Sequence, residues 1–260
     1  MGKPERLDLR MVREGLAASR QRARELIESG AVRVDGLPAT KVARRVRPEQ
    51  GITLARADHA WVGRGALKLL GVLDGFEVDA AGATCADLGA STGGFTQVLL
   101  EQGAARVYAI DVGKGQLAWS LRTDPRVVVR EGVNARHLEA LPEPVDLVVG
   151  DLSFISLGLI LPAIARILRP DGEAVVLVKP QFEVGPAAVE RGGRVTDPTV
   201  RAAAIDAVRR SAEALGFTVL AGRDSPVAGA RSGNIEHFLH LRAGPSDGPA
   251  ERGTVRALED

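Results

Sequence analysis

The chain has 260 residues, of which 45% are hydrophobic and 3% aromatic, so its core must rest on Ala, Val and Leu. Its single cysteine, Cys85, excludes an internal disulfide framework and is typical of a reducing compartment. It contains no run of about 18 apolar residues, and its start, MGKPERLDLR, lacks the apolar core of a signal peptide. We therefore expect a cytoplasmic protein that does not enter a membrane.

The charge is unevenly distributed along the chain. The net charge is +1, but residues 1–60 carry 13 Lys and Arg against 8 Asp and Glu, and the remainder is acidic. A basic N-terminal quarter predicts an anionic partner for that part of the chain. A solvated basic face without a partner is the alternative interpretation.

Residues 1–55 are expected to form a small unit of two helices and short strands. LDLRMVREGL has apolar residues at helical spacing, and Ser19 is placed to cap a second helix, SRQRARELIESG, that Gly30 would end. VRVDG then alternates apolar and polar residues, and its Asp35-Gly36 pair predicts a tight turn between two strands.

This unit resembles the small RNA-binding module found in a small-subunit ribosomal protein, in pseudouridine synthases and in tyrosyl-tRNA synthetases. The likeness rests on GLAASRQRARELIESGAVRVDG, in which Arg20 and Arg24 share a helix face. It implies that arginines contact RNA phosphates and position the RNA without reading much sequence. The candidate RNA-binding residues are Arg6, Arg20, Arg22, Arg24, Lys41, Arg44 and Arg45.

Residues 56–63 are expected to be a linker, in which Trp61 is a packing anchor rather than a base-stacking platform. RGALKLLGVLDGF then predicts a helix with Leu67, Leu70 and Leu73 on its buried side. Lys68 lies off that face, so periodicity alone describes it as an ordinary surface lysine.

From residue 84 onward, strand-like and helix-like segments alternate, and the chain closes with two strands. Several strands are continuous apolar runs, which suits parallel strands buried on both faces. We predict an α/β fold with a doubly wound, Rossmann-like sheet over residues 64–242. The expected strands are the run ending at Asp87, Arg106–Ile110, Arg126–Arg130, Val145–Asp151, Glu173–Lys179, FTVLAGR and EHFLHLR, and the expected helices include Ile155–Leu168 and Val200–Leu215.

Two segments lack clear periodicity. Residues 182–198, FEVGPAAVERGGRVTDP, are rich in glycine and form either a lid or a long surface loop. Residues 243–260 combine Pro, Gly and charge, and we expect them to be disordered.

The stretch TCADLGASTGGF predicts a strand, a glycine-rich turn and a helix start, where a backbone can approach a ligand closely. It does not spell G-x-G-x-x-G, the dinucleotide pattern, and it contains no G-x-x-x-x-G-K-[ST], so an ATP-binding loop is excluded here. Asp87 would repel a pyrophosphate but attract the cationic methionine end of S-adenosylmethionine. A purely structural turn is the alternative.

An acid at the end of the next strand, Asp111, follows Gly89 by 22 residues and can accept hydrogen bonds from a ribose. Asn134 is placed for the adenine edge, or else it caps a turn. The candidate cofactor-binding residues are Asp87, Gly89, Ser91, Thr92, Gly93, Gly94, Phe95, Asp111, Val112, Asn134 and Asp151.

Four polar residues stand where this fold brings loops together over a cofactor: Lys68 on the helix before the sheet, Asp151 and Lys179 at two strand ends, and Glu236 before the last strand. Each alone is unremarkable, since acids at strand ends and surface lysines are common. Their joint placement predicts a catalytic site.

Together with the glycine turn, these residues resemble the TlyA-type (haemolysin A-like) rRNA methyltransferases, whose catalytic part is FtsJ-like. The matching stretches are RGALKL, DLGASTGGFTQVLL, DVGKGQLAWSLR, DPRVVV, DLSFISL, VKPQFEVG and SGNIEHFL. The resemblance implies S-adenosylmethionine-dependent 2′-O-methylation of cytidine in ribosomal RNA, with no metal. The family's Lys-Asp-Lys-Glu tetrad then falls on Lys68, Asp151, Lys179 and Glu236. One departure is His59, where relatives carry arginine before Ala-Trp.

A ribose hydroxyl is a poor nucleophile, so transfer requires that its proton is removed as the oxygen attacks in line with the sulfonium methyl. Lys179 is the expected general base and must then be neutral. Burial and the charge of Lys68 favour that form, whereas Asp151 and Glu236 oppose it.

Three other functions compete with this one. A small-molecule methyltransferase would leave the N-terminal module unused, and an RNA-binding ribosome assembly factor would leave the tetrad unused. A pore-forming haemolysin would need a membrane-spanning segment or a strongly amphipathic basic helix. We expect a monomer that acts on ribosomal subunits and does not bind membranes.

Overall fold

The computed structural model describes residues 4–17, 19–28, 31–54, 61–229 and 232–245. Three expectations therefore lie outside the described residues: Gly30 as a helix stop, His59 in the linker, and the tail from residue 246.

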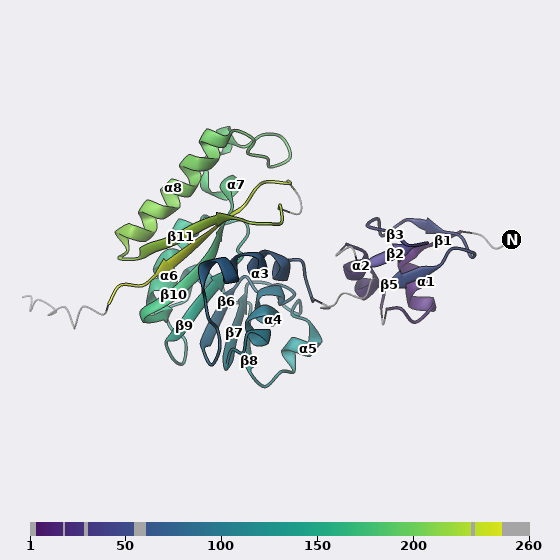
Figure 1. Cartoon of the computed structure of the whole chain (residues 1–260), viewed down its shortest axis with the longest axis horizontal. Coiled ribbons are helices and arrows are strands. Elements are labelled where there is room, and N and C mark those ends of the chain that lie inside the picture. The colour runs from purple at the N-terminus through teal and green to yellow at the C-terminus, as the bar shows by residue number, and fades with distance from the viewer. Residues whose placement is uncertain (1–3, 18, 29–30, 55–60, 230–231, 246–260) are drawn as a thin grey trace, which may run out of the picture.

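The N-terminal unit contains two helices and short strands with their own core (Figure 1). Ser19 caps the second helix as predicted, because its Oγ accepts a hydrogen bond from the Arg22 backbone N–H at 3.1 Å. Asp35 and Gly36 both have positive φ, as a tight hairpin turn requires. The elements are β1 (Glu5–Arg6), α1 (Leu7–Arg13), α2 (Arg20–Glu28), β2 (Val32–Val34), β3 (Leu37–Pro38), β4 (Arg45–Val46) and β5 (Ile52–Leu54).

The larger unit is built on a seven-stranded sheet in the order β11-β12-β10-β9-β6-β7-β8. The pairs from β10 to β8 are parallel, and β12 runs antiparallel between β10 and β11. The doubly wound α/β prediction is therefore confirmed, including the closing pair of strands. The bounds are β6 (Thr84–Leu88), β7 (Arg106–Asp111), β8 (Val127–Glu131), β9 (Val145–Gly150), β10 (Leu168–Val178), β11 (Thr218–Asp224) and β12 (His237–Arg242).

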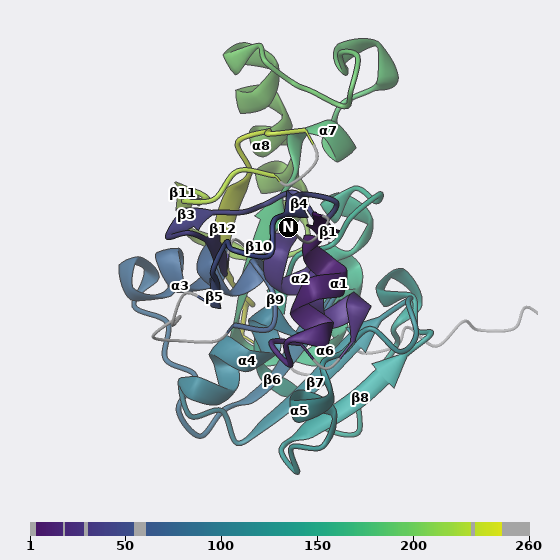
Figure 2. The same cartoon turned by 90° about the vertical axis from the view of Figure 1, so that its right-hand side faces the viewer.

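Two hydrophobic clusters cover the two faces of this sheet, as expected for parallel strands without a solvated side. One cluster joins α3 and α4 to the sheet, and the other joins α6 and α8 to it. The short helix α7 contacts α8 (Figure 2). The helices are α3 (Gly65–Phe76), α4 (Gly94–Glu101), α5 (Trp119–Arg122), α6 (Leu161–Ile167), α7 (Pro180–Glu183) and α8 (Pro198–Ala214), with 3₁₀ turns η1 (Ala135–His137), η2 (Leu157–Leu159) and η3 (Pro186–Ala188).

The predicted buried face of α3 is wrong only in part, because Leu73 is buried as expected and Leu70 packs partly buried against the core. Leu67 is 48% exposed, whereas Lys68 is only 8% exposed and lies on the buried side with Leu69 and Val72. Apolar residues occur all around this helix, so periodicity does not decide which side faces the sheet. The side chain of Lys68 is buried because two carboxylates pair with it, as described below.

The expected helix over Ile155–Leu168 is shorter in the structure. The segment divides into η2 and α6, and Leu168 already belongs to β10, which begins before the predicted start at Glu173. The register between β9 and β10 shifts between Leu168 and Glu173. The early part of this strand contains Pro170 and Gly172, which is why the sequence pattern did not indicate it.

Residues 182–198 form a folded loop that a buried asparagine from another loop holds. Asn234, which is 4% exposed, donates Nδ2–H to the Gly193 carbonyl at 2.8 Å and accepts from the Val195 N–H at 3.0 Å. Asp197 then caps α8 through the Thr199 N–H. None of the helices in the described parts of the chain is long and apolar enough to span a membrane.

Candidate active site

The turn after β6 brings the backbone close to the neighbouring strand. Gly89 has φ +83°, and a Cβ on it would lie 2.9 Å from the Asp151 carbonyl oxygen. At the start of α4, a Cβ on Gly94 would lie 2.8 Å from the Ala66 nitrogen. Glycine is therefore required at both positions, because no side chain fits there.

Asp87 lies beneath this turn and is 1% exposed. Its Oδ2 accepts hydrogen bonds from the Thr96 N–H at 2.9 Å and the Thr96 Oγ at 2.7 Å. Its Oδ1 has no hydrogen-bond partner among the described residues. Burial raises the pKa of Asp87 to about 7, although the bonds from Thr96 oppose the shift. This site can therefore accept a donor or a positive charge.

Asp111 ends β7, and backbone groups occupy both of its carboxylate oxygens. Oδ2 accepts from the Ser91 N–H at 2.8 Å, and Oδ1 accepts from the Gly113 N–H at 2.7 Å. The carboxylate thus holds the glycine turn against the loop after β7. A ribose hydroxyl would have to share these acceptors.

The side chain of Asn134 caps η1, because its Oδ1 accepts from the Arg136 N–H at 3.0 Å. This is the alternative that the sequence left open for it. Neither Asn134 nor Asp111 lines the pocket described below, and Gly93 and Val112 are also absent from its wall. The roles of these four residues toward a cofactor stay predictions.

A pocket of about 540 Å³ opens at the ends of the strands, beside the glycine turn. Asp87, Gly89, Ser91, Thr92, Gly94 and Phe95 line it together with the four tetrad residues. The fold thus brings most of the predicted catalytic and cofactor-binding residues into one pocket, although they lie between positions 68 and 236 of the chain.

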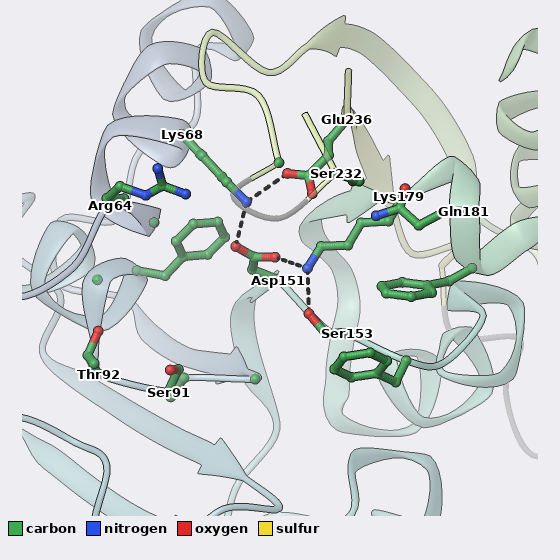
Figure 3. Close-up of a pocket in the computed structure, with 18 of the residues that line it drawn as sticks. Arg64, Lys68, Ser91, Thr92, Asp151, Ser153, Lys179, Gln181, Ser232 and Glu236 are labelled. Atoms are coloured by element: carbon green, nitrogen blue, oxygen red, sulfur yellow. Dashed lines mark hydrogen bonds and ion pairs between the residues drawn. The ribbon is translucent and has the colours of Figure 1, made fainter. Parts of the chain in front are cut away.

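Within this pocket the tetrad forms a chain of alternating charges (Figure 3). The Nζ of Lys68 lies 2.7 Å from the Glu236 Oε2 and 3.0 Å from the Asp151 Oδ2. The other oxygen of Asp151, Oδ1, lies 2.6 Å from the Lys179 Nζ. Lys179 also donates to the Ser153 Oγ at 2.8 Å. Asp151 therefore sits between the two ammonium groups.

The two central groups of this chain are charged at neutral pH. Burial opposes the ionisation of Asp151, but Lys179 and Lys68 outweigh it and lower the pKa of the carboxyl. Burial likewise opposes the charge on Lys68, but Asp151 and Glu236 raise its pKa above the ordinary value. Because of this pairing, the two lysine side chains are held in one orientation more strictly than solvent-exposed lysines are.

Several residues that line the pocket were not predicted from the sequence. Phe154 is 76% exposed, has φ +63°, and its ring lies 5.3 Å from that of Phe182 at an angle of 44°. Positive φ is rare for a bulky residue and marks a constrained position. Both aromatics follow shortly after a tetrad residue, in DLSF and KPQF, which is the signal that could have found them. Other polar residues of this kind are Arg64, Ser153, Gln181 and Ser232.

In the N-terminal unit, several predicted RNA-binding residues take part in ion pairs. Arg6 and Arg20 both contact the buried carboxylate of Asp8, at 2.9 Å and 3.1 Å. The pKa of Asp8 is lowered, and the hydrogen bond from Arg6 is the largest cause. Arg24 pairs with Glu28 at 3.0 Å. These contacts hold the arginine stems in place, and Arg20 and Arg24 remain exposed.

Comparison with known proteins agrees with this geometry. Residues 61–243 match the FtsJ-like methyltransferase family, and residues 5–52 match the S4 domain. A 16S/23S rRNA (cytidine-2′-O)-methyltransferase TlyA from Mycobacterium tuberculosis is 54% identical over 93% of this chain and 91% of its own length. A 23S rRNA (cytidine-2′-O)-methyltransferase TlyA from Campylobacter jejuni is 33% identical over 88% of this chain and 96% of its own.

A solved structure from Streptococcus thermophilus that carries a hemolysin name covers 95% of this chain and 92% of its own, with a TM-score of 0.73 and 36% identity. The resemblance drawn from the sequence motifs is confirmed. The chain belongs to the FtsJ-like methyltransferase family, in its TlyA-type group, and carries an S4 domain before the catalytic unit.

Proposed function

We propose that this protein transfers a methyl group from S-adenosylmethionine to the ribose 2′-hydroxyl of a cytidine in ribosomal RNA. The observation that carries the proposal is the convergence of Lys68, Asp151, Lys179 and Glu236 in one pocket with the glycine turn. We also propose that residues 1–55 bind the RNA, that 56–63 link the two units, and that 64–242 carry out the transfer. The protein binds this RNA as part of ribosomal subunits in the cytoplasm. It acts as a monomer.

The residues present fit S-adenosylmethionine. The unpartnered Oδ1 of Asp87 offers an acceptor for the methionine ammonium, and the turn around Gly89 leaves no side chain between ligand and backbone. Ser91 and Thr92 line the same wall. When bound, this group supplies a methyl carbon made electrophilic by its sulfonium.

The tetrad supplies the proton acceptor and its orientation. Lys179 takes the 2′-hydroxyl proton on its Nζ, which Asp151 and Ser153 hold at 2.6 Å and 2.8 Å. Lys68 fixes the other oxygen of Asp151, and Glu236 fixes Lys68. Lys179 accepts the proton as the neutral amine while the hydroxyl is held in line. Once it is protonated, two charges of each sign compensate one another in this chain.

The aromatic pair of Phe154 and Phe182 gives the acceptor nucleotide a place to stack. Both rings line the pocket, and Phe154 is largely exposed. The Phe182 N–H donates to the Lys179 carbonyl, and Phe154 follows Ser153, whose Oγ accepts from the Lys179 Nζ. Enzymes that modify single nucleotides hold the target base outside its stack against aromatic side chains. This feature favours an RNA nucleotide over a small polar metabolite as the acceptor.

The test is incubation with labelled S-adenosylmethionine and ribosomal subunits, with lipids and small acceptors in parallel. We expect label in RNA, at one nucleotide whose 3′ phosphodiester bond resists alkaline cleavage because its 2′-oxygen is methylated. Label in a small molecule alone would point to a different methyltransferase. Tight RNA binding without any label would favour an assembly factor.

A change of Asp87 to Asn is expected to weaken S-adenosylmethionine binding and remove its pH dependence. Because the pKa of Asp87 is about 7, the carboxyl is mostly protonated at pH 5.5 and half ionised at pH 7. The amine of S-adenosylmethionine stays charged over this range. The affinity of the unsubstituted protein for this ligand should therefore rise about tenfold from pH 5.5 to pH 7. Calorimetry at several pH values measures it, and an equal slope in Asp87→Asn would contradict the role.

Stability should change in the opposite direction. The folded carboxyl of Asp87 binds its proton more tightly than the unfolded one, so the free energy of unfolding of the ligand-free protein falls as pH rises from about 4 to 7. Asp87→Asn should remove this slope while keeping an acceptor for Thr96. Urea unfolding across that range is the measurement.

Replacing Arg20 and Arg24 together with Gln is expected to weaken RNA binding about tenfold and to lower its salt slope by about 1 for each arginine that no longer meets a phosphate. Asp8 keeps its ion pair with Arg6, so the unit should stay folded. S-adenosylmethionine affinity should not change. Arg33→Gln, in the hairpin of the same unit, is the matched control, and equal RNA affinity in both variants would return the helix to a solvated face.

A further inference from the structure

Arg64 is a cation in the pocket wall that the tetrad does not use. It directly precedes α3, and its side chain points from there into the pocket (Figure 3). The two lysines in the pocket wall are paired with carboxylates. Lys68 pairs with Asp151 and Glu236, and Lys179 pairs with Asp151. Among the residues that the structure describes, Arg64 has no ion-pair partner, so it is available to an anion.

Packing places Arg64 next to the glycine turn. A Cβ on Gly63 would lie 2.4 Å from the Thr92 Oγ, and a Cβ on Gly94 would lie 2.8 Å from the Ala66 nitrogen. The backbone on both sides of Arg64 is therefore in direct contact with the turn between β6 and α4. At Gly94 the nearest atoms belong to the backbone, so no side chain fits there.

The pocket has two sides around Asp151. Figure 3 shows Arg64, Ser91 and Thr92 on one side, and Lys179, Ser153 and Gln181 on the other. In the proposed function, the first side holds the methyl donor and the second holds the ribose acceptor. Arg64 therefore faces the donor.

We propose that Arg64 binds the carboxylate of the methionine part of S-adenosylmethionine. This inference rests on the proposed use of that donor. The methionine part is a zwitterion, and Asp87 already offers an unpartnered oxygen to its ammonium. The planar fork of a guanidinium matches a carboxylate with two parallel hydrogen bonds. Arg64 and Asp87 together then recognise both charges of the amino acid.

The test compares two ligands that differ only in this carboxylate, S-adenosylmethionine and its decarboxylated analogue, by calorimetry on the full chain. Arg64→Gln should lower the affinity for S-adenosylmethionine about 10- to 100-fold, as for the loss of a charged hydrogen-bonded pair. It should leave the affinity for the decarboxylated ligand within about twofold. Arg64→Lys should restore part of the missing affinity, because it keeps the charge but not the fork. Arg209→Gln, an exposed arginine on α8, is the matched control.

Three results would overturn the inference. Equal losses for both ligands would mean that Arg64 acts through packing, and no loss for either would mean that it does not touch the donor. Unchanged donor affinity with a raised KM for ribosomal subunits would assign Arg64 to an RNA phosphate instead. If the unsubstituted protein bound neither ligand, the proposed function itself would fail, which separates the two conclusions.

Discussion

Lys179→Ala is expected to lower the rate of methyl transfer by about 100- to 10 000-fold, the range for loss of a positioned general base. Its Nζ is held by Asp151 and Ser153 at the pocket, and no other neutralisable amine has this placement among the described residues. S-adenosylmethionine affinity should stay within about twofold, because Lys179 lies on the side of the pocket away from the glycine turn. Single-turnover transfer to ribosomal subunits and calorimetry are the two measurements.

Lys179→Arg distinguishes a base from a charge. Arginine keeps the positive charge beside Asp151 but cannot give up its proton in a protein. If Lys179 accepts the hydroxyl proton, Lys179→Arg should be as inactive as Lys179→Ala. If Lys179→Arg kept substantial turnover, the residue would serve as a charge, and positioning of the hydroxyl would account for the acceleration.

Lys68→Met is expected to abolish transfer and also to lower the free energy of unfolding by about 3–5 kcal/mol. The reason is that Asp151 and Glu236 both lose the ammonium that pairs with them. Glu236 is only 3% exposed, so its carboxylate is left buried without a partner. Thermal and urea unfolding measure the decrease. The double variant Lys68→Met with Glu236→Gln should recover part of the stability but none of the activity.

The difference in the free energy of unfolding between the unsubstituted protein and Lys68→Met depends on pH through the pKa shifts of Lys68 and Asp151. The pKa of Lys68 is raised, so its contribution is present at neutral pH and is lost only as pH rises through that folded value. The pKa of Asp151 is lowered, so its contribution is lost only as pH falls below the ordinary carboxyl range. The stability gap between the unsubstituted protein and Lys68→Met should therefore be constant from about pH 6 to 9. A gap that closed within this range, or no gap at all, would show that the pairs do not stabilise the fold.

The sheet and the glycine turn were predictable because their signals are local. Continuous apolar runs mark strands buried on both faces, and the glycines in TCADLGASTGGF mark a turn at which the backbone needs positive φ or close approach. The structure confirms both, with β6 ending at Leu88 and α4 beginning at Gly94. Likewise, Ser19 and Asp35-Gly36 are local signals, and both function as predicted in the N-terminal unit.

The tetrad was found by resemblance, and periodicity pointed the wrong way for one of its members. The pattern of α3 described Lys68 as a surface residue, because a helical wheel does not record charges on other elements. Asp151 and Glu236 are 83 and 168 residues away in the chain, and their carboxylates decide where this lysine lies. Asn134 is a similar case, since only the structure shows that its Oδ1 caps η1, and its predicted contact with the adenine edge stays a prediction.

By itself, the sequence determined the fold class, the position of the glycine turn and the basic N-terminal unit, and its resemblance to known methyltransferases predicted the tetrad. The tertiary structure alone decided that Lys68 is buried, that Arg64 faces the glycine turn, and that Phe154 and Phe182 meet beside Lys179. Backbone conformation follows from residues within a few positions of one another. The environment of a charged or aromatic side chain depends on groups that only the packing of distant strands and helices brings within a few ångströms.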